Sequence, residues 1–450
     1  MENIIEKKLD DNILSDNFEY FFSFLADRFE YACELWVKEL ERKFNKKFKP
    51  IWVLSAKQNY YFSKENYIVI NKKLKEIKKK LQNNSAVYLE DYEDLNKEFS
   101  DSRFIQDLIN KLVKKQGRVF VLGFTSACLD LENQKMIILG PSSKIATALD
   151  NKTEHIKLFE SLDVPRNKTR IYSSINDIKE KEKYPFYISA AYTSGGHESG
   201  TIYIENDLDT FFSKLREINK SNHFLVADLI TDIKLSPNVN AVICKDNDTR
   251  IICISDQILR GNQYLGNIYP SKANEPEQDI IIQTTKRIGN YLANLGFRGL
   301  FGLDFIIDSK GKVYCVDLNP RRQGGYLCNI LMSKKLNIPE IELKLVLGEQ
   351  IPNFDYDDFQ ACFVWAHSKI KPYFSNTRIT NCFKIGEPHL PFSDIGSDYR
   401  TIFYPAKCLL VDGNAGYLVV SGSSYEEVKE KIIKETEILI SKNFELYEGI

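Results

Sequence analysis

The sequence has few of the residues that build disulfide-stapled or zinc-bound proteins. Its nine cysteines include no CxxC pair, and its five histidines are scattered over 450 residues. A zinc site and a disulfide framework are therefore not expected in a chain of this size. Reduced and buried thiols in a cytoplasmic protein fit the pattern best.

An excess of one charge is also missing. The 61 basic and 62 acidic residues leave a formal net charge of −1, so the chain carries no electrostatic footprint for DNA or RNA. The basic run at 72–80 is expected to be a solvated helix face. The N-terminal segment is polar and acidic, unlike a secretory signal, and no apolar run reaches the ~18 residues of a membrane span. We expect a cytoplasmic protein that binds neither nucleic acid nor a membrane.

The length and the apolar pattern predict an α/β protein of two or three domains. Over 1–140, apolar runs alternate with helical patterns, which favours a largely parallel sheet. Helical patterns are predicted over 16–45 and 104–113. Strands are predicted near 51–54, 67–70, 87–89, 118–122 and 135–139.

A second domain is predicted over 141–335 and a third over 336–450. The second begins with a helix at 143–162 and contains a Gly/Ser-rich loop at 193–200. Further helices are predicted at 207–219 and 276–295, and strands at 185–190, 201–204, 223–230, 239–244, 250–257, 299–307 and 313–319. In the third domain short strands dominate, and the chain ends in a strand at 416–420 and a charged helix at 424–441.

Residues 299–319 are predicted to form a hairpin whose turn contains Gly311. If Asp308 pairs with Val313, the same register places Asp304 opposite Asp317. Directly opposed residues lie ~4.5–5.5 Å apart at Cβ, and like charges there are destabilising. Side chains alternate along a strand, so Asn319 shares the face of Asp317.

Two carboxylates and an amide oxygen on one face suit Mg²⁺, which would also remove the repulsion. The alternative is a solvated acidic patch on an edge hairpin. The neighbouring residues are apolar, which indicates a buried opposite face and a fixed register. These neighbours are Leu303, Phe305, Val316 and Leu318.

The pattern G-x-D … D-x-N-P-R, following a helix, resembles the ATP-grasp superfamily. The similarity is good over about 140–335 and looser at the ends. Other segments that resemble this superfamily are Asn151-Lys152, Tyr184-Pro185, 225–230, 255–257, 266–270 and 416–422. The resemblance implies an ATP-grasp fold, preceded by an N-terminal parallel-sheet α/β domain and followed by a C-terminal α+β lobe.

The resemblance also implies the residues that bind ATP. Lys152 would contact a phosphate, and Ser194, Gly195, Gly196 and Ser199 would close over the β- and γ-phosphates. The residues expected around the adenosine are Val226, Asp228, Ile230 and Gln257.

The metal ligands implied by the resemblance are Asp304, Asp317 and Asn319, holding Mg²⁺ or Mn²⁺. Arg321 would stabilise an acyl phosphate and its transition state, because a planar guanidinium binds carboxylates and phosphates bidentately. The substrate would also be held by Arg322, Gly324 and Gly325.

Ser189 stands where the superfamily normally has a second phosphate-binding lysine. Arg321 and Arg322 are the cations available to replace that charge. Among the histidines, His197 alone is placed where it could act, and a structural or solvent role is favoured even for it.

The implied activity is ATP-dependent ligation of a small-molecule carboxylate and an amine through an acyl phosphate, with release of ADP and phosphate. An amino acid or small peptide is the default acceptor, and homodimers are common among such proteins. Two alternatives stay open. One is a nucleotide-binding protein with degenerate catalysis, suggested by Ser189; the other is activation of an enol or other oxygen.

Overall fold

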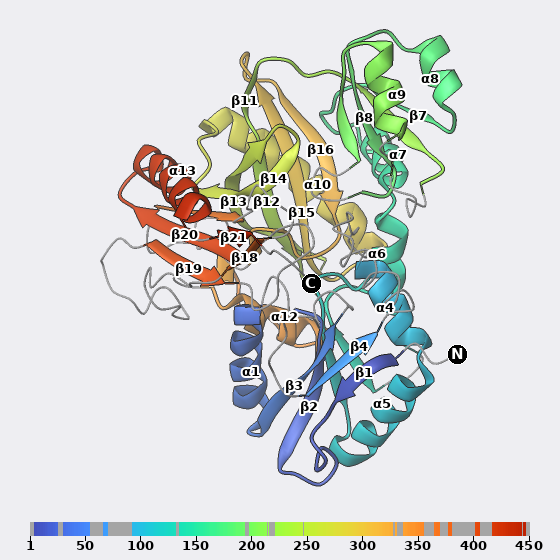
Figure 1. Ribbon diagram of the computed structural model, residues 1–450, viewed down its shortest axis with the longest axis vertical. Helices are drawn as coiled ribbons and strands as arrows, with labels where there is room; N and C mark the ends of the chain where they lie inside the picture. The colour runs from blue at the N-terminus through green and yellow to red at the C-terminus, as the bar shows by residue number, and fades with distance from the viewer. Residues whose placement is uncertain are drawn as a thin grey trace.

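The computed structural model describes most of the chain. The described residues are 4–25, 30–54, 66–70, 92–131, 135–193, 198–213, 215, 221–245, 247–326, 329–330, 336–354, 364–369, 377–379, 401–405, 416–442 and 444–446. Figure 1 shows three main sheets: a six-stranded sheet at the bottom, a four-stranded sheet at the upper right and a nine-stranded sheet at the upper left. The α/β class predicted from the sequence is confirmed.

The six-stranded sheet is largely parallel, as predicted. Its order is β1-β4-β3-β2-β5-β6, and β1 alone pairs antiparallel within it. Its strands are β1 (Ile4–Lys8), β2 (Phe18–Ser23), β3 (Lys47–Leu54), β4 (Tyr67–Ile70), β5 (Val119–Leu122) and β6 (Met136–Leu139). Helix α1 (Glu30–Phe44) covers one face, and α4 (Tyr92–Asp101) and α5 (Arg103–Gln116) cover the other.

The helix predicted over 16–45 is wrong in its first half. Strand β2 occupies Phe18–Ser23, and the helix begins at Glu30. Tyr20, Phe21, Phe22 and Ser23 are all fully buried. A central parallel strand covered on both faces has a continuous apolar run, which short sequence windows do not distinguish from a buried helix. The strand predicted at 87–89 lies outside the described residues.

The four-stranded sheet is antiparallel, with the order β7-β10-β8-β9. Its strands are β7 (Thr169–Tyr172), β8 (Phe186–Ala190), β9 (Ser199–Ile202) and β10 (Phe224–Asp228). Helices α8 (Ile175–Lys181) and α9 (Glu205–Ser213) contribute to the core on one face. Two helices, α6 (Ser143–Leu149) and α7 (Lys152–Ser161), connect this sheet to the six-stranded one.

The single helix predicted over 143–162 is therefore wrong, because the chain breaks between α6 and α7. Asn151 is extended, with φ −79° and ψ 113°. Its side chain accepts a hydrogen bond from the Thr153 amide at 3.0 Å. Asparagine favours this N-cap role because it satisfies one of the free amides of a new helix.

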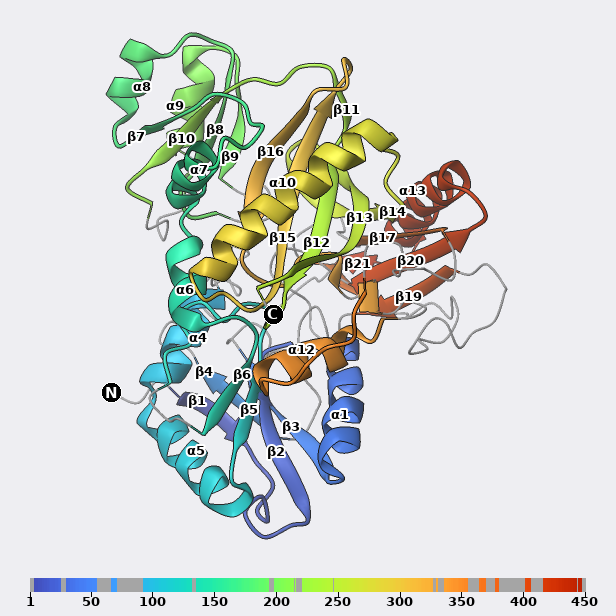
Figure 2. The same cartoon turned by 180° about the vertical axis from the view of Figure 1, so that it is seen from behind.

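The nine-stranded sheet contains the predicted hairpin and extends to the end of the chain. Its order is β11-β15-β12-β13-β14-β17-β20-β19, and β16 pairs with β15. Its strands are β11 (Ile233–Leu235), β12 (Pro237–Ile243), β13 (Thr249–Arg260), β14 (Gln263–Tyr269), β15 (Gly299–Asp308), β16 (Val313–Asn319), β17 (Val364–Lys369), β19 (Thr401–Pro405) and β20 (Gly416–Gly422). Helix α10 (Glu275–Asn294) lies across the outer face of the sheet, as Figure 2 shows.

The C-terminal part contains one helix that the sequence did not predict, α12 (Ile338–Val346). The Asn337 side chain caps it by accepting from the Glu340 amide. Helix α12 packs beside α1 and β6, which Figure 2 shows from behind. The remaining elements are α13 (Tyr425–Lys442), which packs on β17 and β20, and the paired strands β18 (Thr377–Ile379) and β21 (Phe444–Leu446).

Candidate active site

Asp304 on β15 pairs with Asp317 on β16, so the predicted opposition of the two acids is confirmed. The assumed pairing at the turn is wrong, because Val313 pairs with Ile307 and not with Asp308. An irregularity between Asp304 and Phe305 shifts the register by one residue and restores the opposition. Without this bulge, Asp304 would face Val316. Bulges often re-aim side chains beside active sites, and this one brings two carboxylates together.

Neutral amides surround Asp304. Its Oδ1 accepts hydrogen bonds from Asn238 Nδ2 at 2.5 Å and from Gln257 Nε2 at 3.0 Å. Its Oδ2 accepts from Asn319 Nδ2 at 3.1 Å. Burial, with the negative charge of Asp317 added to it, raises the pKa of the Asp304 carboxyl to about 6. Asp304 accepts a fourth, longer hydrogen bond from Gln323. The four hydrogen bonds together do not bring the pKa back to its usual range.

Two basic side chains, Lys152 and His155, contact Asp317. Lys152 Nζ lies 2.7 Å from its Oδ1, and His155 Nδ1 lies 3.3 Å from the same oxygen. Burial alone would raise the pKa of the Asp317 carboxyl, but Lys152 and His155 lower it below its usual range. The two opposed acids are thus stabilised differently, one by amides and the other by positive charge.

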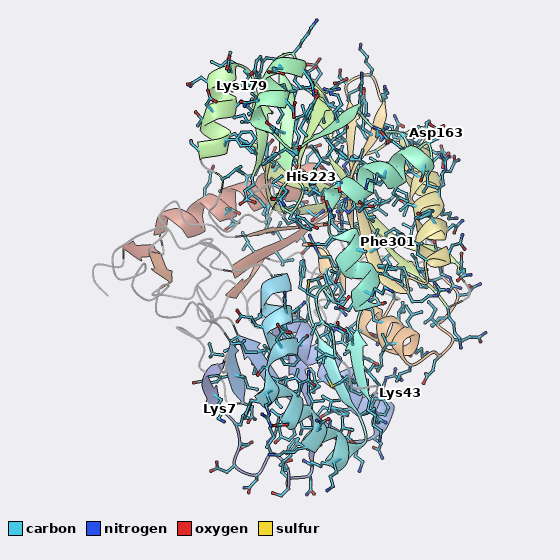
Figure 3. All side chains as sticks on the ribbon, turned by 90° about the vertical axis from the view of Figure 1, so that its right-hand side faces the viewer. Lys7, Lys43, Asp163, Lys179, His223 and Phe301 are labelled. Carbon is cyan, nitrogen blue, oxygen red and sulfur yellow. The ribbon has the colours of Figure 1, made fainter. Side chains whose placement is uncertain are left out.

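Helix α7 delivers Lys152 and His155, which lie one turn apart on the same face. The helix is fixed at both ends. The Lys152 amide donates to Ala191 O at 3.0 Å. At the other end, Arg287 of α10 donates to the carbonyls of Leu162 and Asp163, and Figure 3 shows Asp163 at this end beside α10.

His155 and Asp150 are site residues that the sequence analysis missed. His155 is 3% exposed, and the scattered histidine spacing gave no reason to select it over His197, which lies outside the described residues. Burial raises the pKa of the Asp150 carboxyl, although Arg321, His155 and Lys152 oppose that rise. The three-residue spacing of Lys152 and His155 within one helix was the available signal.

Arg321 and Arg322 diverge after β16. The Arg321 guanidinium lies 4.8 Å from the centre of the Phe124 ring, which follows β5 in the six-stranded sheet. Its Nη1 donates to the Arg322 carbonyl at 3.0 Å. Within the described residues no carboxylate forms an ion pair with Arg321. Its guanidinium therefore lies beside the end of β5 in the six-stranded sheet.

Arg322 does not fit the expected substrate role, because its side chain is buried in a protein network. It forms an ion pair with Glu342 of α12 at 2.7 Å and donates to the carbonyls of Gly123 and Leu139. Glu342 also accepts from the Tyr326 hydroxyl at 2.8 Å. The two consecutive arginines thus have different surroundings. Arg321 lies against Phe124, whereas Arg322 connects β5, β6 and α12 through its hydrogen bonds and ion pair.

The loop after Arg322 packs tightly on the hairpin. A Cβ at Gly302 would lie 1.9 Å from the Gln323 amide, and one at Gly324 would lie 2.4 Å from the Tyr264 ring. The Gly325 carbonyl accepts from the Asn329 amide at 3.0 Å. Gly324 therefore lies too close to Tyr264 to carry a larger side chain without a shift. Gly325 helps to hold the loop through its backbone hydrogen bond.

Gly302→Ala is expected to lower the free energy of unfolding by about 1–3 kcal/mol, because the new methyl group would displace the buried Gln323 side chain. Urea unfolding would measure the change. Gly140→Ala is the matched control, because its Cβ would meet neighbours at 3.7 Å or more. Equal stability of the two variants would contradict the close packing of Gly302.

The residues predicted around adenosine differ in burial and lie on different elements. Val226 lies in the interior of its sheet between Arg170 and Ile188, with its side chain fully buried. Its backbone is therefore engaged in the sheet, and the prediction that it presents groups to adenine does not fit. Ile230 is half-buried in the connection between β10 and β11.

Asp228 and Gln257 have protein partners. The Asp228 carboxylate is exposed and pairs with Arg170 at 2.7 Å. Gln257 contacts Asp304, as described above, and so lies with the metal acids and not apart from them. The prediction that Gln257 lines the nucleotide pocket stays a prediction.

In the Gly/Ser-rich loop predicted to close over the phosphates, Ser194, Gly195 and Gly196 lie outside the described residues. Ser199 pairs with Ser189 across β8 and β9. Tyr187, two residues before Ser189, shares its face and was missed by the sequence analysis. Burial raises the pKa of the Tyr187 phenol, and a hydrogen bond with Ser199 opposes that rise.

The donor set fits a hard divalent cation. Asp304, Asp317 and Asn319 provide oxygen atoms, and Asn319 already turns its amide nitrogen towards Asp304. Among the described residues, no group of three His, Cys, Asp or Glu side chains forms a complete metal cage. Mg²⁺ sites in phosphate-handling enzymes usually combine one or two carboxylates with phosphate oxygens, so an incomplete cage suits that cation.

Known proteins with similar sequences are ligases and synthases. A family model described as L-aspartate–L-methionine ligase, ATP grasp, matches residues 165–319. This chain is 22% identical over 290 residues to the carbamoyl phosphate synthase large chain of Clostridium botulinum, covering 61% of this chain and 26% of that one. It is 33% identical over 100 residues to L-propargylglycine–L-glutamate ligase of Streptantibioticus cattleyicolor, covering 22% and 20%.

Solved structures match over nearly the whole chain. N5-carboxyaminoimidazole synthetase from Staphylococcus aureus, complexed with ADP, gives a TM-score of 0.61 at 12% identity, covering 93% of this chain and 97% of that one. The biotin carboxylase domain of 2-oxoglutarate carboxylase from Hydrogenobacter thermophilus gives 0.65 at 15% identity, covering 97% and 92%. The chain is thus similar in sequence to ATP-grasp ligases over residues 165–319, and it has the fold of these solved structures.

The chain spans about a quarter or less of the two curated relatives named above. The superfamily and fold predicted from the sequence are confirmed. Among the described residues, no helix is both long and apolar enough to cross a membrane.

Proposed function

We propose that this chain is an ATP-dependent carboxylate–amine ligase. The observation that carries the proposal is the pair of opposed acids, Asp304 and Asp317, with Arg321 two residues beyond the strand that ends in Asn319. The two charges face each other on a partly buried sheet, an arrangement that a cation stabilises. The family match to an amino-acid ligase supports amino acids as substrates.

ATP would lie between the four-stranded sheet and the hairpin, where Lys152 of α7 contacts Asp317. Support comes from neighbours solved with adenine nucleotides. Asp304, Asp317 and Asn319 would hold Mg²⁺, or Mn²⁺ with the same ligands. The bound cation would supply charge neutralisation between the β- and γ-phosphates.

The residues of this chain would act by positioning and electrostatics. Arg321 would hold the substrate carboxylate, whose oxygen attacks the γ-phosphorus as the bond to ADP breaks. The nitrogen of the amine would then attack the acyl carbon, and phosphate would leave. Lys152 contacts Oδ1 of Asp317 with one of its three N–H donors and would bind a phosphate oxygen with another.

We also propose that the chain has three domains, divided after residues 140 and 335. The protein would form a homodimer and would be located in the cytoplasm. One neighbouring biotin carboxylase domain is described as a dimer. Strands β17, β19 and β20 share the hairpin's sheet, so residues from 336 onwards would complete the same substrate site.

A screen for ADP release with Mg-ATP would test the proposal, using pairs of amino acids and small acids. Aspartate with methionine is the first pair to try, because of the family match. We expect ADP release only when both a carboxylate and an amine are present, with a product mass equal to their sum less water. ADP release without an amine, together with a phosphorylated product, would indicate that the protein activates an enol or other oxygen instead of a carboxylate.

The second candidate is a nucleotide-binding protein without ligation, and the neutral Ser189 favours it. Ser189 is 8% exposed and donates to the Ala190 carbonyl at 3.0 Å. Ser189→Lys is expected to tighten ATP binding about tenfold, equivalent to ~1.4 kcal/mol, because it adds a cation beside Ser199, its partner across β8 and β9. Calorimetric titration with ATP would measure this. Ser189→Met is the control for added volume without charge, and equal affinities of the two variants would show that no phosphate lies near this position.

A further inference from the structure

His155 satisfies a free carbonyl at the end of α6. Its Nε2 lies 2.5 Å from the Leu149 carbonyl oxygen. Leu149 is the last residue of α6, so its carbonyl has no partner within the helix. A carbonyl only accepts hydrogen bonds, and Nε2 must therefore carry the proton in this contact. This bond fixes the plane of the ring.

The other ring nitrogen is turned towards the candidate metal site. The His155 side chain is 4% exposed, and its Nδ1 atom is buried. It lies 3.3 Å from Asp317 Oδ1. Buried polar atoms normally have a polar partner, and within the described part of the chain Asp317 is the group that Nδ1 contacts.

Lys152 and His155 both approach Oδ1 of Asp317. Two contacts on one oxygen restrict the rotation of the carboxylate and leave Oδ2 for a cation. We propose that His155 is a positioning residue, which orients Asp317 for the divalent cation from outside the coordination sphere. This inference rests on the proposed function, because it assumes that Asp317 binds the cation.

The Leu149 carbonyl thus fixes the ring of His155, and the ring in turn fixes the carboxylate of Asp317. Outer partners of metal ligands fix ligand geometry, and their loss typically costs about 10–100-fold in metal affinity or activity. If His155 served α6 alone, any residue that donates to Leu149 would replace it without affecting the cation.

Two substitutions separate these roles. His155→Gln can place its amide nitrogen at the position of Nε2, so it keeps the bond to Leu149 and loses the contact with Asp317. His155→Asn can place its amide nitrogen at the position of Nδ1, so it keeps the contact with Asp317 and loses the bond to Leu149. His223→Gln is the control, because His223 is exposed before β10 (Figure 3).

The measurement is ADP binding by calorimetry over a series of Mg²⁺ concentrations and in EDTA, with thermal unfolding of each variant. We expect His155→Gln to raise the Mg²⁺ concentration for half-maximal ADP binding by about 10–100-fold, without changing ADP affinity in EDTA. His155→Asn should keep the Mg²⁺ dependence near that of the wild type and lower the unfolding temperature.

Asp317→Asn serves as the reference. A wild-type Mg²⁺ dependence in His155→Gln, together with a lost dependence in Asp317→Asn, would overturn the role of His155 and leave the proposed function standing. An unchanged dependence in both would refute the cation site itself. A change of similar size in His155→Gln and His155→Asn, tracking their loss of stability, would also overturn the positioning role.

Discussion

Asp317→Ala and Arg321→Ala are each expected to abolish ADP release stimulated by substrates, with kcat falling by at least about 10²–10³-fold. Asp317 is one of two opposed acids, and its removal would deprive the cation of a ligand. Arg321 would lose the planar contact with the carboxylate that becomes the acyl phosphate. A coupled assay of ADP formation would measure both.

Both variants should remain folded. Removing the Asp317 carboxylate also removes the charge that faces Asp304, which offsets the ion pair lost with Lys152. Circular dichroism and the unfolding temperature would verify this. Asp279→Ala, on the exposed side of α10, is the control for Asp317, and Arg321→Lys separates the charge from the guanidinium shape. Turnover like that of the wild type in either alanine variant would refute the site.

Glu342→Leu is expected to lower the free energy of unfolding by about 3–5 kcal/mol, because it leaves the Arg322 guanidinium buried without its counter-charge. Glu342 is 2% exposed and Arg322 is 4% exposed. Burial lowers and Glu342 raises the pKa of Arg322, with a net rise. The arginine stays charged when its partner is removed, because a guanidinium is effectively always protonated in proteins. Urea unfolding would give the free energy.

Two further variants test this account. Glu349→Ala removes a more exposed ion pair, with Lys43, and should change the unfolding free energy by about 1 kcal/mol or less. The double variant Arg322→Met with Glu342→Leu should recover much of the loss, because no buried charge remains. A single Glu342→Leu variant as stable as Glu349→Ala would contradict the buried network.

The opposition of Asp304 and Asp317 could be predicted from the sequence because the two residues are close together in one hairpin, where alternation and turn chemistry limit the choices. The predicted turn pairing was nevertheless wrong by one residue, and the bulge at Asp304 compensated for it. A bulge has no composition signal in this strand. The opposition of Asp304 and Asp317 was thus predicted from an incorrect intermediate step.

Residues whose roles depend on distant partners could not be predicted. Arg321 and Arg322 are adjacent in sequence, and Glu342, a partner 20 residues later, decides which of them is structural. His155 was passed over because its partners, Leu149 and Asp317, meet it only in the fold. Strand β2 was mistaken for a helix for a similar reason, since layers on both sides bury it.

The continuity of the nine-stranded sheet has a consequence for the synthesis of the chain. Ile268 on β14 pairs with Ala366 on β17, a partner made almost a hundred residues later. Until that partner leaves the ribosome, β14 is an open strand edge, which in other proteins is a site of unwanted pairing between chains. Such distant pairings also slow folding, because a long loop must close first. The hairpin that carries the metal acids can form early, but the sheet that supports it is complete only when the C-terminal strands have been made.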